Sequence, residues 1–414
     1  MSPTPRLAAA LAVAAVLVIV LSPLVAGLVI TALVAAFVAD ARMASGRVEV
    51  AREAPGILAR GVAAPLSVTA AAAGGSVRLR QPVPPDIRVR PSEAVAALRA
   101  ELVAGRRGRH VLPAVAVRRE GPLGLARWDR RTGATTDVVV YPDLPAARRL
   151  AAAVRKGRFR DPGRLARGPL GLGTDFESLR DYTPDDDIRQ VNWLATARAG
   201  RPISNRYRVD QDRDVVCVVD TGRLMAAPLG DRTRLDAAVD AVAAVALVAD
   251  VVGDRCGCVA FAAGVRRRVR PVRAGGERVV QAVFDLEPEP VDSDYELAFR
   301  TVAGGKRSLV LVYTDLLEEA AARPLVAAVP VLARHHAVVV ATVVDEDLDA
   351  TLKTTPSRPA DVYVAAVAAE VLAARSAVVR RIVAAGAVVI EAPAASLGAA
   401  CVSAYLRAKA RARL

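Results

Sequence analysis

The sequence predicts a multidomain chain that begins with a transmembrane helical hairpin and ends with a doubly wound α/β domain. Three observations predict this fold class: a long uncharged stretch near the start, short alternating strands in the middle, and apolar strands that alternate with helices in the last half. The expected segments are a two-helix membrane anchor at 1–45, a small β-sandwich-like domain at 46–142, a connector at 143–213 and the α/β domain at 214–414.

The membrane anchor is expected from the stretch Leu7–Ala39, which contains no charged residue. A single helix of that length would reach roughly 50 Å, against about 30 Å of bilayer hydrocarbon. Pro23 lies near the middle of the stretch, and proline removes a helix hydrogen bond. We therefore expect two short spans, at about 7–21 and 24–39, that form a hairpin.

The orientation of the anchor is predicted from its flanking arginines. Arg6 precedes the apolar stretch, Arg42 and Arg47 follow it, and the expected turn has no basic residue. This distribution favours both termini, and the soluble body, in the cytoplasm. The alternatives are a single tilted span with an external body and a cleaved signal peptide, although the apolar stretch is much longer than a signal-peptide core.

The net charge of +14 lies in the first half of the chain. Residues 1–213 hold 33 basic and 19 acidic side chains, whereas residues 214–414 hold 24 of each. Basic residues beside a membrane anchor are attracted to anionic lipids by roughly 1 kcal/mol each, so membrane lipids are expected partners. Nucleic acid is not expected, because the basic residues are spread among apolar and acidic ones and no nucleic-acid-binding motif occurs.

The middle region contains short strand-like runs separated by proline and glycine turn signals. The clearest runs are Leu66–Ala70, Ser76–Arg80 and Asp137–Tyr141. The segment Ser92–Leu102 fits either a strand or a short helix. These runs predict the β-sandwich-like domain.

The last half begins with the apolar run Val215–Val219, which ends in Asp220 and has the composition of a buried parallel strand. Further strands are expected at 257–262, 308–313, 337–344 and 387–391, and helices at 232–252, 316–335, 363–384 and 394–412. In such sheets ligands gather at the carboxyl ends of the strands. Asp220, Asp315 and Asp345 each follow a strand at that edge.

The four cysteines are expected to be free, buried thiols. Their positions, Cys217, Cys256, Cys258 and Cys401, match neither a zinc-ligand spacing nor a disulfide framework. Three of them lie in apolar strand-like runs, where a thiol behaves as a small hydrophobic group.

The segment from Gly171 to Arg198 is the most distinctive in the chain and reads GLGTDFESLRDYTPDDDIRQVNWLATAR. It resembles the signature of the domain-of-unknown-function fifty-eight family. The matching residues are Phe176, Leu179, Arg180, Tyr182, Asp186, Arg189, Trp193, Ala197 and Arg198. Asp175 replaces the usual Glu, and Asp185 stands where the family has Gly, a difference expected to alter the turn.

The resemblance implies a membrane-associated protein with a von Willebrand factor type A-like terminal domain. It also implies a MoxR-type AAA+ ATPase as partner, in the assembly, maturation or stress handling of other proteins. Two interpretations of the signature stay open. In the first it is a structural clasp, with Phe176 and Trp193 buried and an ion-pair network among Arg180, Asp186, Arg189 and Arg198. In the second these residues and Tyr182 form a docking surface, where Arg and Trp are frequent anchors.

Type A domains commonly bind Mg²⁺ through Asp-x-Ser-x-Ser, a Thr and a further Asp, because hard cations prefer oxygen ligands. Here Gly222 and Leu224 occupy both serine positions, and the segment Asp292–Glu296 stands where the Thr loop is expected. Asp315 matches the remaining Asp. We expect no tight metal site, with weak binding of a hydrated Mg²⁺ between Asp220 and Asp315 left open.

No catalytic constellation is recognised. The three histidines, His110, His335 and His336, accompany no nucleophile motif, and Gly304–Arg307 lacks the spacing of a phosphate-binding loop. We therefore expect a membrane-tethered adaptor and not an enzyme, with ATP hydrolysis supplied by another polypeptide. The alternative is an outward-facing, metal-dependent adhesion or ligand-binding protein, and a hidden hydrolase is the third class.

Overall fold

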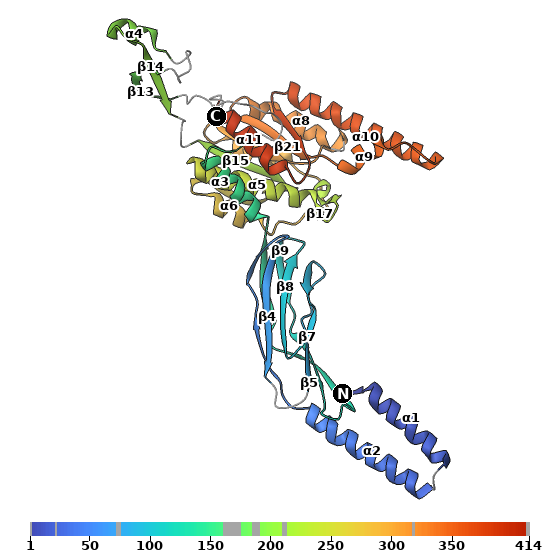
Figure 1. The fold of residues 1–414 in the computed structure, drawn as a ribbon. Helices are drawn as coiled ribbons and strands as arrows, with labels where there is room; N and C mark the ends of the chain where they lie inside the picture. Colours follow the sequence, from blue (N-terminus) through green and yellow to red (C-terminus); the bar gives the residue numbers. More distant parts are fainter. Residues whose placement is uncertain are drawn as a thin grey trace. The chain divides into compact units, whose positions relative to one another are not determined.

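The computed structural model describes residues 2–20, 23–71, 76–159, 175–183, 191–208, 213–316 and 319–410 (Figure 1). The chain divides into two compact units, Met1–Tyr141 and Pro142–Leu414. Each unit has its own hydrophobic core. The four segments expected from the sequence stay a prediction, because this division groups the anchor with the β-rich region.

The first unit begins with two apolar helices, α1 (Pro5–Val20) and α2 (Pro23–Ala44), which lie side by side (Figure 1). Each has a proline at its first position, where the missing amide proton costs no intrahelical hydrogen bond. Within α2 the stretch Gly27–Ala44 is long and apolar enough to cross a membrane, whereas α1 is a shorter apolar helix. The cytoplasmic orientation of the body stays a prediction.

A second helix, α10 (Pro359–Ala384) in the second unit, is also long and apolar enough to span a membrane. Only the length and the composition of α10 indicate that it could span a membrane. The carboxy-terminal half of α10 packs in the α/β core through Val378 and Ile382, whereas only 17% of its apolar 18-residue stretch is buried.

The rest of the first unit is β-rich. One sheet has the order β1-β11-β10-β5-β7, a second β2-β4-β8-β6, and a third β3-β12-β9. The strands are β1 (Ser2–Pro3), β2 (Glu49–Glu53), β3 (Ile57–Ala59), β4 (Ala63–Ala71), β5 (Ser76–Arg80), β6 (Ile87–Arg90), β7 (Glu93–Val95), β8 (Ala97–Ala104), β9 (Gly108–Leu112), β10 (Val115–Glu120), β11 (Ala126–Thr132) and β12 (Thr136–Tyr141).

All three sheets contribute to one core. Alternate residues of the strands point into it, as the pleat requires: Leu66 and Val68 on β4, for example, are buried while their neighbours are less so. The segment Ser92–Leu102, which fitted a strand or a helix, forms β7 and most of β8. The prediction of a β-rich region is confirmed.

The carboxyl end of α2 is fixed to the β-rich region through Asp40. This side chain is fully buried. Its carboxylate accepts backbone hydrogen bonds from Leu123 at 2.8 Å, Leu125 at 2.7 Å and Ala126 at 2.9 Å. A buried carboxylate is stable only when such donors replace its water, so Asp40 holds the helix against the turn before β11.

The same junction contains two further hydrogen bonds. The indole N–H of Trp128 donates to the carbonyl of Ala41 at 2.9 Å. The hydroxyl of Thr4 donates to the carbonyl of Gly124 at 2.6 Å. Both ends of the helical hairpin are therefore attached to the same turn.

The second unit is built on a six-stranded sheet with the order β19-β18-β15-β20-β21-β22. All neighbouring pairs are parallel except β18 and the edge strand β19. The strands are β15 (Asp214–Asp220), β18 (Arg255–Phe261), β19 (Val265–Arg273), β20 (Ser308–Tyr313), β21 (Ala337–Val343) and β22 (Val388–Ala392).

Helices surround this sheet. They are α3 (Leu144–Arg155), α5 (Arg234–Val252), α6 (Gly276–Val283), α7 (Tyr295–Ala303), α8 (Glu319–Ala333), α9 (Glu346–Lys353), α10 and α11 (Leu397–Ala410), with a short 3-10 helix at Arg223–Ala226 and a small hairpin of β16 (Pro228–Leu229) and β17 (Arg232–Thr233). The helix α3 lies in the segment expected as a connector and packs against α5.

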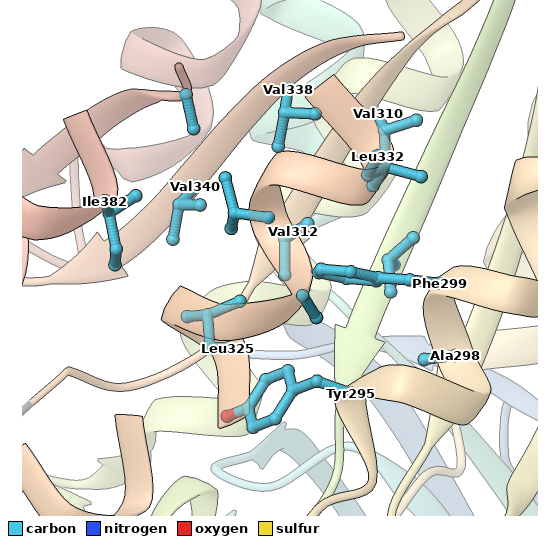
Figure 2. Close-up of a cluster of buried hydrophobic side chains, with 14 of the residues drawn as sticks. Tyr295, Ala298, Phe299, Val310, Val312, Leu325, Leu332, Val338, Val340 and Ile382 are labelled. Carbon is cyan, nitrogen blue, oxygen red and sulfur yellow. The ribbon is translucent and has the colours of Figure 1, made fainter. Parts of the chain in front are cut away.

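One face of the sheet packs against α7, α8 and α10 (Figure 2). Val310, Val312, Val338 and Val340 meet Phe299 and other apolar side chains there. The central strands are buried on both faces, which explains their continuous apolar sequence.

The expected α/β strands and main helices are confirmed, with small differences at their ends. The sequence did not indicate β19, α6, α7 or α9. The strand β19 is rich in arginine because it lies at the exposed edge, where charged side chains are ordinary.

We predict that Asp40→Ala lowers the free energy of unfolding of the first unit by about 3 kcal/mol, because three buried amides lose their acceptor. Hydrogen exchange of the Leu123, Leu125 and Ala126 amides in the detergent-solubilised full chain measures this. Asp137→Ala, at an exposed position of β12, is the matched control. Equal exchange in both variants would contradict the role of Asp40.

Candidate functional site

The candidate site lies where the direction of the sheet connections reverses. From the central strand β15 the chain continues to β18 on one side, whereas β20 lies on the other. The carboxyl ends of such neighbouring strands form the usual ligand crevice of an open α/β sheet. Asp220 ends β15, and Asp315 and Asp345 follow β20 and β21, so the expected carboxylates do share this edge.

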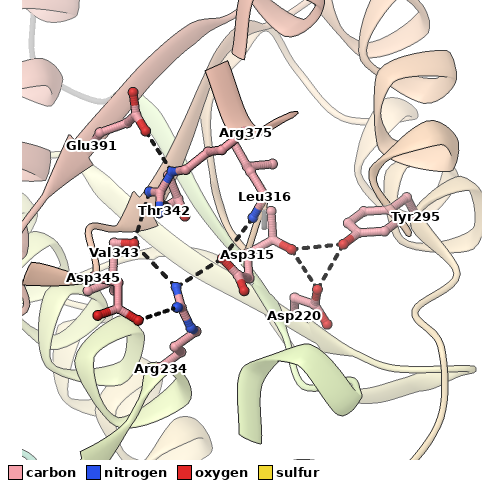
Figure 3. Close-up of polar contacts among 11 residues, drawn as sticks. Asp220, Arg234, Tyr295, Asp315, Leu316, Thr342, Val343, Asp345, Arg375 and Glu391 are labelled. Atoms are coloured by element: carbon pink, nitrogen blue, oxygen red, sulfur yellow. Dashed lines mark hydrogen bonds and ion pairs between the residues drawn. The ribbon is translucent and has the colours of Figure 1, made fainter. Parts of the chain in front are cut away.

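Asp220 is almost fully buried and accepts hydrogen bonds from four donors, of which Tyr295 is labelled in Figure 3. The hydroxyls of Ser293, Thr314 and Tyr295 donate at 2.5, 2.6 and 2.9 Å, and the amide of Gly222 donates at 2.8 Å. Ser293 and Tyr295 come from the segment Asp292–Glu296 that stands where a Thr loop is expected. This segment therefore supplies hydroxyl donors to the aspartate.

Gly222 has no room for the serine of the metal-binding pattern. A Cβ atom at this position would lie 2.9 Å from the carbonyl oxygen of Val291 and would collide with the hydroxyl of Ser293. The close packing of the Asp292–Glu296 segment against the loop after β15 therefore requires a glycine, and not a serine, at position 222.

Tyr295 keeps its hydroxyl proton. Burial raises its pKa well above the usual value, and the nearby negative charge of Asp220 raises it further. The Tyr295 hydroxyl is also 2.8 Å from that of Thr314. The three groups form a compact hydrogen-bonded cluster within the protein.

Asp315 is paired with a buried guanidinium. Arg234, in the first turn of α5, lies 3.0 Å from Asp315 and 3.4 Å from Asp345 (Figure 3). It also donates to the carbonyl of Val343 at 3.3 Å. The side chains of Arg234 and Asp315 are 3% and 2% exposed, so each charge depends on the other for stabilisation.

A second arginine extends this network. Arg375 of α10 donates to Glu391 at 2.8 Å and to the Val343 carbonyl at 2.9 Å. Two guanidiniums thus converge on the last carbonyl of β21 and connect the ends of β20, β21 and β22. The sequence pattern did not indicate either arginine. An arginine in the first turn of a helix opposes the helix dipole, and this was the available signal for Arg234.

Within the second unit, His336 lies away from this cluster. His336 precedes β21, at the opposite edge of the sheet, and its Nδ1 is 2.8 Å from the Ser308 hydroxyl. Burial lowers its pKa, so the neutral form is favoured. Among the residues that the structure describes, no group of three His, Cys, Asp or Glu side chains could hold a metal ion.

The four cysteines lie within the second unit. Cys217, Cys256, Cys258 and Cys401 are all free and buried, as expected. Burial raises the pKa of Cys258 and Cys401 to about 12, so these thiols are poor nucleophiles at neutral pH.

The signature segment forms a separate hairpin of β13 (Asp175–Asp181) and β14 (Ile203–Arg208), with the short helix α4 (Trp193–Ala199) near its end (Figure 1). The side chain of Asn192 caps α4 by accepting from the Ala195 amide at 3.0 Å, and Gly200 ends it in the left-handed conformation. Local chemistry therefore specifies this helix.

The structure describes the side chains of some of the expected signature residues and not of others. Phe176 and Arg180 lie on β13, opposite Tyr207 and Ser204 in register, but their side chains lie outside the described part. Asp186 and Arg189 also lie outside the described residues.

The remaining signature residues are less buried than a clasp requires. Tyr182 is half-buried and Arg198 is exposed. Trp193 is 69% exposed, so the expectation that it is buried in a clasp is wrong. Leu194 and Leu179 are exposed beside it in the sequence, at 66% and 47%.

Residues 178–358 match the sequence model of a family described as Protein of unknown function DUF58. The resemblance seen in the signature is confirmed. The matched part of this chain is similar to the DUF58 family. The matched region runs from the signature hairpin to the start of α10 and covers less than half of the chain.

Curated proteins similar to this chain include Uncharacterized protein Rv1480 of Mycobacterium tuberculosis and Uncharacterized protein Mb1516 of Mycobacterium bovis. Each is 27% identical over 187 residues, which cover 42% of this chain and 58% of the relative. The match thus spans less than two thirds of the relatives' length.

We predict that Arg234→Gln lowers the free energy of unfolding of the second unit by about 3–5 kcal/mol, because Asp315 stays buried without its cation. Arg223→Gln is the control, since its ion pair with Asp292 is exposed and contributes at most about 1 kcal/mol. Denaturant unfolding of the solubilised full chain measures both. Similar losses in the two variants would contradict the dependence of Asp315 on Arg234.

The raised pKa of Tyr295 predicts a pH effect. The folded chain keeps this proton while the unfolded chain releases it near about pH 10. The contribution of Tyr295 to the free energy of unfolding is therefore fully present below that pH and declines as pH rises above it. Tyr295→Phe should lose about 1 kcal/mol at neutral pH and show a shallower decline above about pH 10. Thermal unfolding across this range tests it, and parallel curves for both proteins would exclude it.

Proposed function

We propose that this chain is a membrane-tethered, protein-binding adaptor that works with a MoxR-type AAA+ ATPase in the assembly, maturation or stress handling of other proteins. The observation that carries the proposal is the internal pairing of the carboxylates at the sheet edge: Asp220 and Asp315 are engaged by internal hydroxyls and a guanidinium. Groups held in this way have no free capacity for acid, base or metal chemistry. The ATPase partner follows from the family resemblance.

The proposal assigns a von Willebrand factor type A-like fold to the second unit. The doubly wound sheet, with aspartates after its central strands, agrees with what the signature resemblance implies. The donor set does not fit a tight magnesium site. Arg234 already provides a cation at Asp315, and a serine cannot be accommodated at position 222.

The proposed contact surface for the partner is the α4 region. Trp193 and Leu194 are exposed at the start of this helix, close in sequence to Arg198. Exposed Trp and Arg side chains are frequent anchors of protein interfaces. This supports the docking interpretation of the signature. The basic residues on both sides of the helical hairpin support a cytoplasmic body, where an ATPase would have ATP.

We predict that crosslinking and purification of the full chain from solubilised membranes recovers a MoxR-type ATPase. The double variant Trp193→Ser with Leu194→Ser should lower this recovery by about tenfold or more, because interface anchors carry most of the binding energy. The control, Val95→Ser with Val111→Ser, removes exposed apolar groups from the first unit and should leave recovery unchanged.

Failure to recover any such ATPase under crosslinking would count against the adaptor. The alternative, an outward-facing metal-dependent adhesion protein, makes a different prediction for calorimetric titration with Mg²⁺. Tight binding that Asp220→Ala abolishes would support the alternative and overturn the adaptor assignment of this edge.

A further inference from the structure

A basic cavity lies in the first unit, directly after α2. It has a volume of about 370 Å³ and is formed by the chain that follows α2 and by strands of the β-rich region. Arg47, Arg119 and Arg130 line it, together with Trp128 and Glu49. Three guanidiniums against one carboxylate give the lining a net positive charge.

The arginines are positioned for an external anion. Arg47 and Arg130 are exposed, and neither forms an ion pair with any residue that the structure describes. The guanidinium of Arg119 is buried against Gly46, where a side chain would collide with it. The cavity thus combines one fixed guanidinium with two that can close over a ligand.

Trp128 forms an ordered aromatic wall of the cavity. Its indole N–H is held by the Ala41 carbonyl of α2, and the guanidinium of Arg130 lies 4.7 Å from the centre of its ring. The cation–π contact orients Arg130 without neutralising its charge. The anion-binding capacity of the guanidinium edge is therefore kept.

The position of the cavity identifies the source of the anion. The apolar stretch Gly27–Ala44 ends at Ala44, which is itself a lining residue. When this stretch crosses a bilayer, the cavity lies at the level of the lipid head groups, where Trp side chains are enriched. Val48, Val50 and Val117 add an apolar part to the lining, suited to the glycerol and upper acyl region of a lipid.

We propose that this cavity binds the phosphate of an anionic phospholipid head group. Guanidiniums recognise phosphate oxygens through paired, charge-assisted hydrogen bonds. The proposal rests on the membrane tether of the proposed function. A nucleic acid is a poorer fit, because the one aromatic ring in the lining is already covered by Arg130.

The test uses Trp128 as an optical reporter. The chain has two tryptophans, so Trp193→Phe leaves Trp128 alone. The detergent-solubilised full chain is titrated with short-chain phosphatidylglycerol, with phosphatidylcholine of the same acyl chains, and with inorganic phosphate. Native mass spectrometry of the same samples counts the bound lipid, so a changed baseline fluorescence cannot imitate binding.

Saturable binding of phosphatidylglycerol, with much weaker binding of phosphatidylcholine, is the expected result. Arg47→Gln with Arg130→Gln should weaken it by about fivefold for each guanidinium removed. Arg119 is kept, because its replacement would disturb the buried region. The control variant, Arg88→Gln with Arg99→Gln, removes two exposed arginines that do not line the cavity and should bind as the parent does.

Three results would overturn the proposal: equal binding of both lipids, equal losses in the two double variants, or saturation of the Trp128 signal by inorganic phosphate at the same concentration. Vesicle flotation separates this failure from failure of the tether. A chain that floats with phosphatidylcholine vesicles but shows no lipid selectivity has a tether and lacks the site. A chain that does not float with any of the vesicles has no membrane tether.

Discussion

The ion pair between Arg234 and Asp315 holds together the carboxyl edge of the sheet in the second unit. Both side chains are nearly inaccessible to water, so neither charge is stable without the other. Asp345 and the Val343 carbonyl share the same guanidinium, and Arg375 connects that carbonyl to Glu391. The ends of three neighbouring strands are therefore fixed by buried charge.

Local patterns were sufficient to predict most of the α/β fold. Runs such as Val215–Val219 and Leu309–Tyr313 are apolar throughout because both faces of these strands are covered. The same reasoning placed the three aspartates at one edge. The strand β19 was missed because an arginine-rich edge strand has no apolar pattern to detect. The donors to Asp220 were missed for another reason: Ser293 and Tyr295 lie more than seventy residues away, and local sequence does not encode such pairings.

The signature illustrates a second limit of sequence reading. A tryptophan among arginines and carboxylates fits a buried clasp and a contact surface equally well, because both use the same residue types. The exposure of Trp193 favours the surface. Its helix is specified locally, by the Asn192 cap and Gly200, and needs no burial of the indole to form. The resemblance to the family could be recognised because it depends only on the order of the residues in the sequence. The burial of those residues cannot be inferred from that order.

The bond between Asp40 and Leu123 joins residues that are 83 positions apart, and this separation imposes an order on biosynthesis. The ribosome releases the helical hairpin long before the turn that receives its carboxylate. During that interval the Asp40 carboxylate has none of its three amide donors and depends on water. Asp40 can form these hydrogen bonds only after the later strands have been synthesised. The attachment of α2 to the β-rich region is therefore made only after most of the first unit has been synthesised.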